Sequence, residues 1–235
     1  MPQSKKRFLK GSLAGVRLFD GLDAEQRFAL EQLCSWQQVD DRTEVLRHKD
    51  NTSDVVFLIS GRARAIAYSA EGKQVAFREI NSGEMFGELA AIDGGPRSAS
   101  VMTVGPGVVA TMAAAEFRKM IDREPIVREN LLRYLVEMVR GLSGRVFELS
   151  TLLVRPRTFT DLIRLAEKIP VIDGWACLDP APIIEDIANR IGARREGVNR
   201  VISELIKDGI LRRRGKALLI DLDALRRRLG EAAGE

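Results

Sequence analysis

The sequence predicts an α+β protein with three parts: a β-rich, jelly-roll-like domain, a long helix and a small winged helix-turn-helix domain. Short apolar runs broken by glycines occupy residues 36–113, which is typical of a compact roll of short strands. Apolar residues then recur at steps of three and four over 115–153, which indicates a helix. Two further helix-sized stretches flank Gly192. We expect a basic flexible tail at 1–12, the roll at 13–120, the long helix at 121–155 and the winged domain at 158–235.

The composition is that of a folded protein without a metal centre. Of 235 residues, 45% are hydrophobic and 30% are charged, as in globular rather than disordered chains. No apolar segment follows the basic N-terminus and no run approaches about 18 apolar residues, so we expect a cytoplasmic protein without a secretory signal or membrane span. Two distant cysteines, Cys34 and Cys177, and the single His48 argue against a disulfide framework, a zinc site or an iron–sulfur cluster. We find no catalytic set and expect no cofactor.

Positive charge is concentrated in two segments. Residues 1–10 carry four bases and no acid. Residues 190–216 carry nine bases against three acids, a local excess of six, whereas the whole chain has a net charge of only +4. Such a patch is suited to neutralising phosphates, although a solvated helix face would have the same composition.

The N-terminal part is expected to begin with a helix and to continue as strands. Residues 23–35 read as a helix with Asp23 as its N-cap. Its apolar positions are Phe28, Leu30 and Leu33. The runs VVFLIS, GRARAIAYS and AEGKQVAFREI then read as strands, and Glu71-Gly72 is a good hairpin turn between the last two.

The long helix carries a narrow apolar stripe. Pro125 breaks the helical pattern near its start. The stripe consists of the apolar residues at 131, 135, 138, 142, 149 and 152, with Arg145 interrupting the repeat. This is an a/d seam of roughly three heptads, and its charged flanks favour pairing with a second copy of the chain over packing on the roll. Because proline disfavours helical geometry in the residue before it, we expect the helix to end at Arg155-Pro156-Arg157.

The C-terminal part has the layout of a helix-turn-helix with a wing. A helix over 158–168 and a hairpin at Asp173-Gly174 come first. Helices over 183–190 and 194–208 then flank Gly192, and ILRRRGKALLIDL reads as two strands turning at Arg214-Gly215. The residues expected to be buried are Ile184, Ile187, Ala188 and Ile191 on the first of these two helices, and Val198, Val201, Ile202 and Leu205 on the second.

Four polar residues lie outside the apolar stripe in the first two turns of the second helix. They are Arg195, Glu196, Asn199 and Arg200. The N-terminal end of a recognition helix is the part that reaches base edges in the major groove. Arginine pairs with guanine through two hydrogen bonds, and glutamate accepts one from cytosine. We therefore predict DNA binding, and the alternative is a surface cluster of ion pairs.

The segment MFGELAAIDGGPRSASV, residues 85–101, places a carboxylate and a guanidinium at the ends of a stretch of mostly small residues. Glu88 follows a glycine and Arg97 follows a proline. The small residues between them allow close approach to the backbone, so we expect a bound ligand here.

FGELA followed by PRSA resembles the phosphate-binding cassette of cyclic-nucleotide domains. Together with the helix-turn-helix, it makes nearly the whole chain similar to members of the cyclic AMP receptor protein/fumarate–nitrate regulator family of bacterial transcription factors. The resemblance implies a cyclic-nucleotide-binding β-roll, a dimerisation helix and a winged helix-turn-helix DNA-binding domain. It implies a homodimeric transcription regulator that responds to cyclic AMP and works with RNA polymerase.

The resemblance also assigns residues to the two sites. Arg97 and Ser98 would hold the cyclic phosphate and Glu88 the ribose 2′-hydroxyl. Leu142 and Ser143 stand where cyclic AMP receptors have a Thr-Ser pair that reaches the base. Because leucine offers no side-chain hydrogen bond, we expect cyclic GMP to bind in a measurable range as well. The full ligand set is Gly87, Glu88, Leu89, Arg97, Ser98, Leu142 and Ser143.

On DNA, the resemblance implies a pseudo-palindromic site with TGTGA-like half-sites one helical turn apart. The DNA-binding set is Arg194, Arg195, Glu196, Asn199, Arg200, Arg214 and Lys216, of which Arg214 and Lys216 would hold phosphates. One alternative is a DNA binder that needs no ligand and keeps the cassette as structure. Another is a nucleotide-regulated enzyme, but residues 158–235 are few for a catalytic domain and the only histidine lies in the roll.

Overall fold

The computed structural model describes residues 11–68 and 74–232. They divide into two compact units, Met1–Val139 and Arg140–Glu235, which are taken in turn below. The bases of the expected tail at 1–10 and the expected turn at Glu71-Gly72 lie outside the described residues. Within the described ranges, no helix is both long and apolar enough to cross a bilayer.

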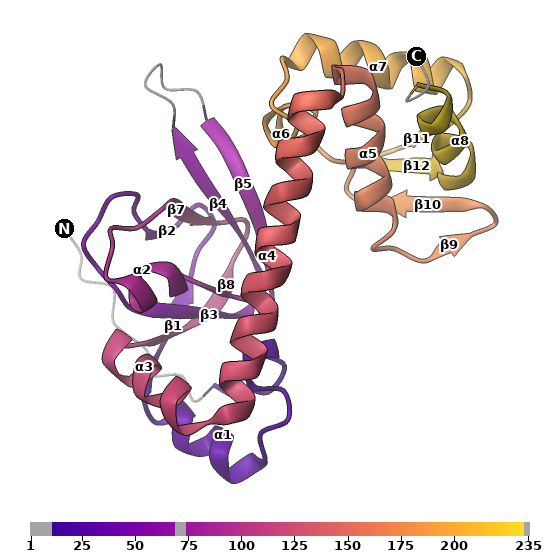
Figure 1. Ribbon diagram of the computed structural model, residues 1–235. Helices are drawn as coiled ribbons and strands as arrows, with labels where there is room; N and C mark the ends of the chain where they lie inside the picture. The colour runs from indigo at the N-terminus through magenta and orange to yellow at the C-terminus, as the bar shows by residue number, and fades with distance from the viewer. Residues whose placement is uncertain (1–10, 69–73, 233–235) are drawn as a thin grey trace. The chain divides into compact units, whose positions relative to one another are not determined.

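The first unit is built on two four-stranded antiparallel sheets (Figure 1). One sheet has the order β1 (Cys34–Val39), β8 (Gly107–Met112), β3 (Val55–Ser60) and β6 (Met85–Phe86). The other has the order β2 (Glu44–Leu46), β7 (Ser100–Thr103), β4 (Arg62–Tyr68) and β5 (Gln74–Asn81). The predicted β-rich roll is confirmed.

The unbroken apolar sequence of strand β3 follows from its position between two buried clusters. Val55 and Phe57 belong to a buried cluster shared with the helices of this unit. Val56 and Leu58 point the other way and pack among residues of both sheets. Because successive side chains of a strand face opposite sides, a strand covered on both faces needs apolar residues throughout.

The helices of this unit are η1 (Arg17–Phe19), α1 (Ala24–Glu31), α2 (Glu88–Asp93), α3 (Ala114–Arg123) and the start of α4 (Pro125–Thr151). The Asp23 N-cap is confirmed: its carboxylate accepts from Gln26 N at 2.8 Å, and Gln26 Oε1 accepts from Asp23 N at 3.0 Å. The predicted extension of this helix to residue 35 is wrong, because Cys34 starts the ladder opposite Met112 of β8. Leu30, within α1, is buried, whereas Leu33, beyond the end of the helix, is exposed.

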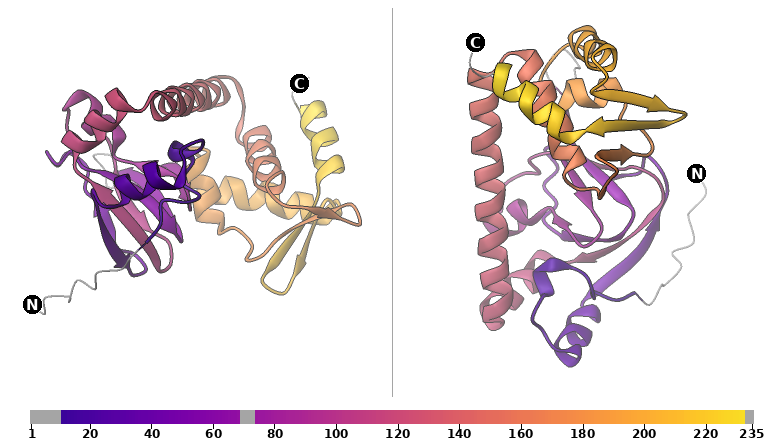
Figure 2. Two further views of the ribbon diagram at one scale, coloured as in Figure 1. Left: turned by 90° about the horizontal axis from the view of Figure 1, so that it is seen from below. Right: turned by 90° about the vertical axis from the view of Figure 1, so that its right-hand side faces the viewer.

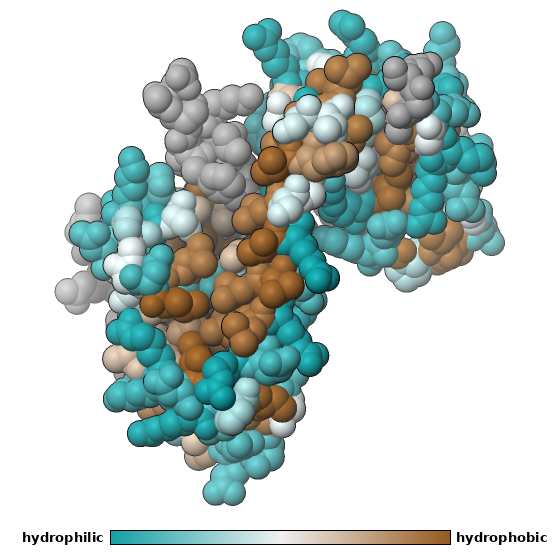
Figure 3. All heavy atoms as spheres, viewed as in Figure 1, coloured by the Kyte–Doolittle hydropathy of each residue, from teal (hydrophilic) through white to brown (hydrophobic). Residues whose placement is uncertain are grey.

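Helix α4 carries two apolar stripes rather than one. Val127 and Leu131 are buried in the core of the first unit, and Leu135 packs against that core. The predicted seam therefore starts on the wrong face, since its first two residues cover the roll. The exposed stripe shares Leu142 and Leu149 with the predicted seam, and elsewhere it lies one residue or more further along. Its members are Leu132, Val136, Val139, Leu142, Val146, Leu149 and, just past the helix end, Leu153. Figure 3 shows apolar surface following α4.

As far as residue 232, the second unit contains the end of α4, four further helices and one four-stranded sheet. The helices after α4 are α5 (Val154–Ala166), α6 (Ile184–Arg190), α7 (Arg195–Lys207) and α8 (Leu222–Ala232). The sheet has the order β11 (Leu211–Arg214), β12 (Ala217–Asp221), β10 (Trp175–Leu178) and β9 (Val171–Ile172). The hairpin of β11 and β12 projects from the helices in both views of Figure 2 and forms the predicted wing.

Pro156 does not end the long helix, contrary to the prediction. Helix α4 ends at Thr151, and α5 begins at Val154 with Pro156 in its first turn. Proline is tolerated at such a position because the first N–H groups of a helix have no partner within the helix. The sequence signal was therefore a helix start and not a helix stop.

The predicted core of the helix-turn-helix is confirmed. Ile187, Ala188 and Ile191 are buried and Ile184 is half-buried against the same cluster. All four expected residues of α7 are buried: Val198, Val201, Ile202 and Leu205. Between the helices Gly192 has a φ of +62°, the left-handed conformation that glycine adopts without strain.

Candidate functional site

The cassette segment folds as a tight turn into the short helix α2. Gly87 precedes this helix with a φ of +84°. A Cβ at this position would lie 2.6 Å from Arg97 Nη1 and 3.0 Å from the carbonyl oxygen of Asp54. Glycine adopts this backbone conformation without strain, and it is the only residue without a Cβ that would clash here. Gly87, which is in the predicted ligand set, thus lets the Arg97 side chain lie against the backbone.

Arg97 is buried, with 2% of its surface exposed. Its Nη1 donates to Gly87 O at 2.9 Å and its Nη2 to Asp54 O at 2.8 Å, while Nε donates to Thr52 Oγ1 at 3.0 Å. Burial lowers the pKa of Arg97, and nearby carboxylates, Glu88 among them, oppose this effect. Three of its five N–H donors are therefore engaged, and one N–H on each terminal nitrogen remains for an anion.

Glu88, the first residue of α2, is also buried, with 4% of its surface exposed. Burial raises the pKa of this carboxyl group, and Arg78, Tyr134 and Arg97 act in the opposite direction. The Tyr134 hydroxyl lies 3.5 Å from Glu88 Oε1. Sequence reasoning missed Arg78 and Tyr134, because a lone arginine in a strand and a lone tyrosine in a helix carry no local signal of a site.

The remaining predicted ligand residues divide into two groups. Leu89 follows Glu88 in the chain and Ser98 follows Arg97, and both are exposed. Leu142 and Ser143 lie on exposed positions of α4 beyond the first unit. The structure therefore brings Gly87, Glu88 and Arg97 together, and the contribution of Leu142 and Ser143 stays a prediction.

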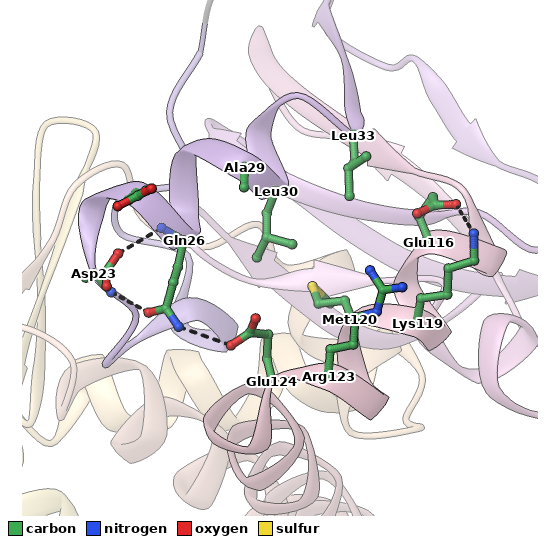
Figure 4. Close-up of a pocket in the computed structure, with 11 residues that line it drawn as sticks. Asp23, Gln26, Ala29, Leu30, Leu33, Glu116, Lys119, Met120, Arg123 and Glu124 are labelled. Atoms are coloured by element: carbon green, nitrogen blue, oxygen red, sulfur yellow. Dashed lines mark hydrogen bonds and ion pairs between the residues drawn. The ribbon is translucent and has the colours of Figure 1, made fainter.

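A cleft of about 370 Å³ lies elsewhere in the first unit, between α1 and α3 (Figure 4). Leu30, Leu33 and Met120 give it an apolar floor. Charges of both signs surround that floor, including an ion pair of 2.7 Å between Lys119 and Glu116. None of the predicted ligand residues lines this cleft.

The recognition-helix residues predicted from the sequence all lie on the solvent side of α7. Arg195, Glu196, Asn199 and Arg200 are exposed, while the opposite face of the helix is buried. Arg194, also exposed, is the N-cap residue. In the described part of the chain, none of these side chains forms an ion pair, which argues against a surface cluster of ion pairs.

The wing adds exposed bases beside this helix. Arg214 and Lys216 flank Gly215 at the tip of the β11–β12 hairpin, and both are exposed. Nearer its base, the Arg212 guanidinium lies 4.4 Å from the ring centroid of Trp175 on β10. Stacking of this kind fixes a cation while leaving it charged. Helix and wing together present a positive, solvent-facing surface suited to phosphates.

Two family models match the chain. The cyclic nucleotide-binding domain matches residues 36–124, and the Crp-like helix-turn-helix domain matches residues 162–228. The first match contains the cassette and the second contains α6, α7 and the wing.

Relatives and solved structures resemble the chain over most of its length. A CRP-like cAMP-activated global transcriptional regulator from Mycobacterium tuberculosis is 29% identical over 220 residues, which cover 92% of this chain and 97% of the relative. A double mutant of CooA from Carboxydothermus hydrogenoformans has a TM-score of 0.77 at 18% identity, covering 95% of this chain and 98% of that one. The c-di-GMP responsive global regulator CLP of Xanthomonas campestris has a TM-score of 0.73 at 21% identity, covering 84% and 99%.

Proposed function

The chain belongs to the cyclic AMP receptor protein/fumarate–nitrate regulator family, and we propose that it is a homodimeric regulator whose binding to DNA depends on cyclic AMP. Membership makes it a transcription regulator with a cyclic-nucleotide-binding domain and a DNA-binding domain, and not an enzyme. Cyclic AMP as the effector, the dimer and the form of the DNA site are the proposed parts. RNA polymerase as a partner and a cytoplasmic location belong to the same proposal.

The observation that carries the nucleotide proposal is the buried pair of Glu88 and Arg97 beside Gly87. A phosphodiester needs a fixed pair of donors, and a ribose hydroxyl needs an acceptor. Arg97 is held by three protein acceptors and keeps one N–H on each terminal nitrogen. Glu88 supplies the carboxylate from the first turn of α2. A cyclic nucleotide satisfies both requirements with one molecule.

The experiment that tests this proposal is calorimetric titration with cyclic AMP, cyclic GMP and cyclic di-GMP, followed by DNA binding with each nucleotide. The third nucleotide is included because CLP of Xanthomonas campestris, which has a similar fold, is a c-di-GMP responsive regulator. We expect cyclic AMP to bind best and cyclic GMP to bind measurably. If cyclic di-GMP binds most tightly, then cyclic di-GMP and not cyclic AMP is the effector. If none of the three nucleotides binds, the nucleotide proposal is refuted.

One observation favours the alternative of a DNA binder that needs no nucleotide. Arg97 donates to three protein acceptors, so these bonds alone give it a structural role in the cassette. A cassette retained only as structure would keep these bonds. Electrophoretic mobility shifts with and without cyclic AMP distinguish the two functions, because the alternative requires the same DNA affinity in both.

The exposed stripe of α4 supports the proposed dimer. Val136, Val139 and Val146 are about half exposed or more, and apolar residues at steps of three and four are the seam of a helix pair. We expect Val136→Glu with Val146→Glu to give a monomer by light scattering, because both charges would enter the seam. The matched control is Arg133→Glu with Arg140→Glu, on exposed positions outside the stripe. An unchanged dimer in the valine variant would refute the assignment.

A further inference from the structure

Tyr134 and Arg78 form a polar group behind Glu88 that lies outside the cassette segment. Tyr134 comes from α4 and Arg78 from β5. The Arg78 guanidinium lies over the Tyr134 ring, 5.3 Å from its centroid, and Arg78 Nη1 donates a hydrogen bond to the Tyr134 hydroxyl. Strand β5, the cassette helix α2 and the more distant helix α4 therefore meet beside one buried carboxylate.

The contacts around Tyr134 favour a hydrogen bond from its hydroxyl to the Glu88 carboxylate. Because Arg78 donates to the phenol oxygen, the phenol must give its own proton to another group. Two acceptors are within reach, Met85 O at 3.3 Å and Glu88 Oε1 at 3.5 Å. Met85 O already accepts from Arg78 Nη2 at 3.2 Å. A carboxylate is also a stronger acceptor than a carbonyl oxygen, so the hydrogen bond from the Tyr134 hydroxyl is stronger to Glu88 than to Met85 O.

Charged groups from two other segments lie near Glu88. Arg78 faces it from β5 and Arg97 from the segment after α2, while Glu84, before β6, pairs with Arg78 at 3.2 Å. Burial acts to lower the pKa of Arg78, but Tyr134, Glu84 and Glu88 raise it overall, so Arg78 stays protonated. Burial raises the pKa of Glu88 against the opposing effects of Arg78 and Tyr134.

We propose that Tyr134 and Arg78 are positioning residues of the nucleotide site, which keep the Glu88 carboxylate ionised and in place to accept the ribose 2′-hydroxyl. The inference rests on the proposed function, because it needs a nucleotide at the cassette. An ionised carboxylate has only acceptors, so it matches a hydroxyl donor. Without the Tyr134 hydroxyl, the effect of burial on Glu88 is less opposed and that match weakens.

The test is a comparison of two ligands on Tyr134→Phe, which keeps the ring and removes the hydroxyl. The ligands are cyclic AMP and its 2′-deoxy analogue, which lacks the hydroxyl that Glu88 accepts. We expect the affinity for cyclic AMP to fall about tenfold and that for the 2′-deoxy analogue to change by less than about threefold, because one hydrogen bond to a charged group is lost. Equal losses for both ligands would show a merely structural role and overturn the proposal.

Acidification gives a second readout. Protonation of Glu88 removes its negative charge and makes it a weaker acceptor, so cyclic AMP binding weakens as the pH falls through the pKa of Glu88. In Tyr134→Phe that pKa is higher, so the weakening should begin at a higher pH than in the wild type. The same onset in both proteins would contradict the proposal.

Two further variants keep the test decisive. Arg78→Met should reproduce the ligand-selective loss, and Arg78→Lys, which keeps the charge, should recover part of it; if Tyr134→Phe does not fold, this pair decides. Arg133→Gln, at the next and exposed position of α4, is the control that should bind both ligands normally. A wild type that binds neither ligand refutes the proposed function instead. A wild type that binds both, with variants that lose both alike, refutes only the inference.

Discussion

The cassette and the recognition helix use the same residue types in opposite environments. Glu88 and Arg97 are buried, and their side chains are held by protein partners. Glu196 and Arg200 are exposed on α7. A buried site has its geometry before the ligand arrives, whereas exposed side chains lose rotamer freedom when they bind. Substitutions in the cassette should therefore affect folding and binding together, and substitutions on α7 should affect binding alone.

The second unit also has a buried charge pair, but its residues are not those proposed to contact DNA. Arg190, in the last turn of α6, donates through Nη2 to Asp161 Oδ2 at 2.8 Å and through Nε to both carboxylate oxygens at 3.1 and 3.2 Å. Both side chains are nearly inaccessible. In this unit the charges that maintain the fold and the charges proposed to contact DNA are different residues, whereas in the cassette they are the same.

The largest effect is expected at this buried pair. Asp161→Ala removes the carboxylate that accepts all three of these hydrogen bonds from the buried Arg190, and breaking such a pair costs about 3–5 kcal/mol of unfolding free energy. Glu167→Ala is the matched control in the same region, because its pair with Arg226 at 2.7 Å is about half exposed and exposed pairs contribute about 0–1 kcal/mol. Urea unfolding of both variants measures the difference. Equal costs would show that burial of the pair does not decide its contribution.

The next effect is on nucleotide affinity. Arg97→Ala removes the proposed ionic partner of the nucleotide phosphate, a loss of about 2–5 kcal/mol for a buried pair. It also leaves the carbonyl oxygens of Gly87 and Asp54 without a donor, so stability should fall as well. Arg118→Ala is the control, since the exposed Arg118 donates to Ala91 O of α2 at 2.8 Å outside the pair. Calorimetry should show cyclic AMP binding lost only in Arg97→Ala, and binding within about threefold of wild type would refute the cassette assignment.

Substitutions on the DNA-facing side should leave stability unchanged. Arg200→Ala is expected to cost about 1–3 kcal/mol in DNA affinity and to relax the preference at one position of each half-site. Lys216→Ala should weaken all sequences alike and reduce the slope of affinity against salt by about one unit. Fluorescence anisotropy with cognate and scrambled DNA over a salt series measures both. Equal loss on the two DNAs for Arg200→Ala would contradict a base contact.

The smallest effect concerns the base of the nucleotide. Leu142→Thr would add a hydroxyl where leucine offers packing only, and should widen the preference for cyclic AMP over cyclic GMP by up to about tenfold, the contribution of one hydrogen bond at about 0.5–1.5 kcal/mol. Leu142 also belongs to the exposed stripe of α4, so the dimer mass must be measured alongside both titrations. A wild type that ignores cyclic GMP at about a thousand times its cyclic AMP dissociation constant would contradict the idea.

Local patterns predicted much of the fold and part of the site. The cap at Asp23 and the buried face of α7 follow from residues within one or two turns, and both are confirmed. The proximity of Gly87 and Arg97 was also predictable, because ten residues separate them and a known cassette contains both. Thr52 and Tyr134 were not predictable, because Thr52 lies 45 residues from Arg97 and Tyr134 lies 46 residues from Glu88. Arg78 is closer in sequence to Glu88, but it was not predictable either, because its hydrogen bond to Tyr134 joins residues that are 56 positions apart.

The sequence by itself determined the order of roll, long helix and winged helix-turn-helix, because periodicity and turn residues act over a few neighbours. Only the tertiary structure decided which stripe of α4 is internal. Leu131 and Leu132 have identical side chains, yet Leu131 is buried in the first unit and Leu132 is exposed. Nothing within the helix distinguishes them; the burial of each is set by the elements that pack against one face of α4. The environment of Glu88 was decided in the same way, because the cost of burying its charge depends on Arg78 and Tyr134, which only folding brings beside it.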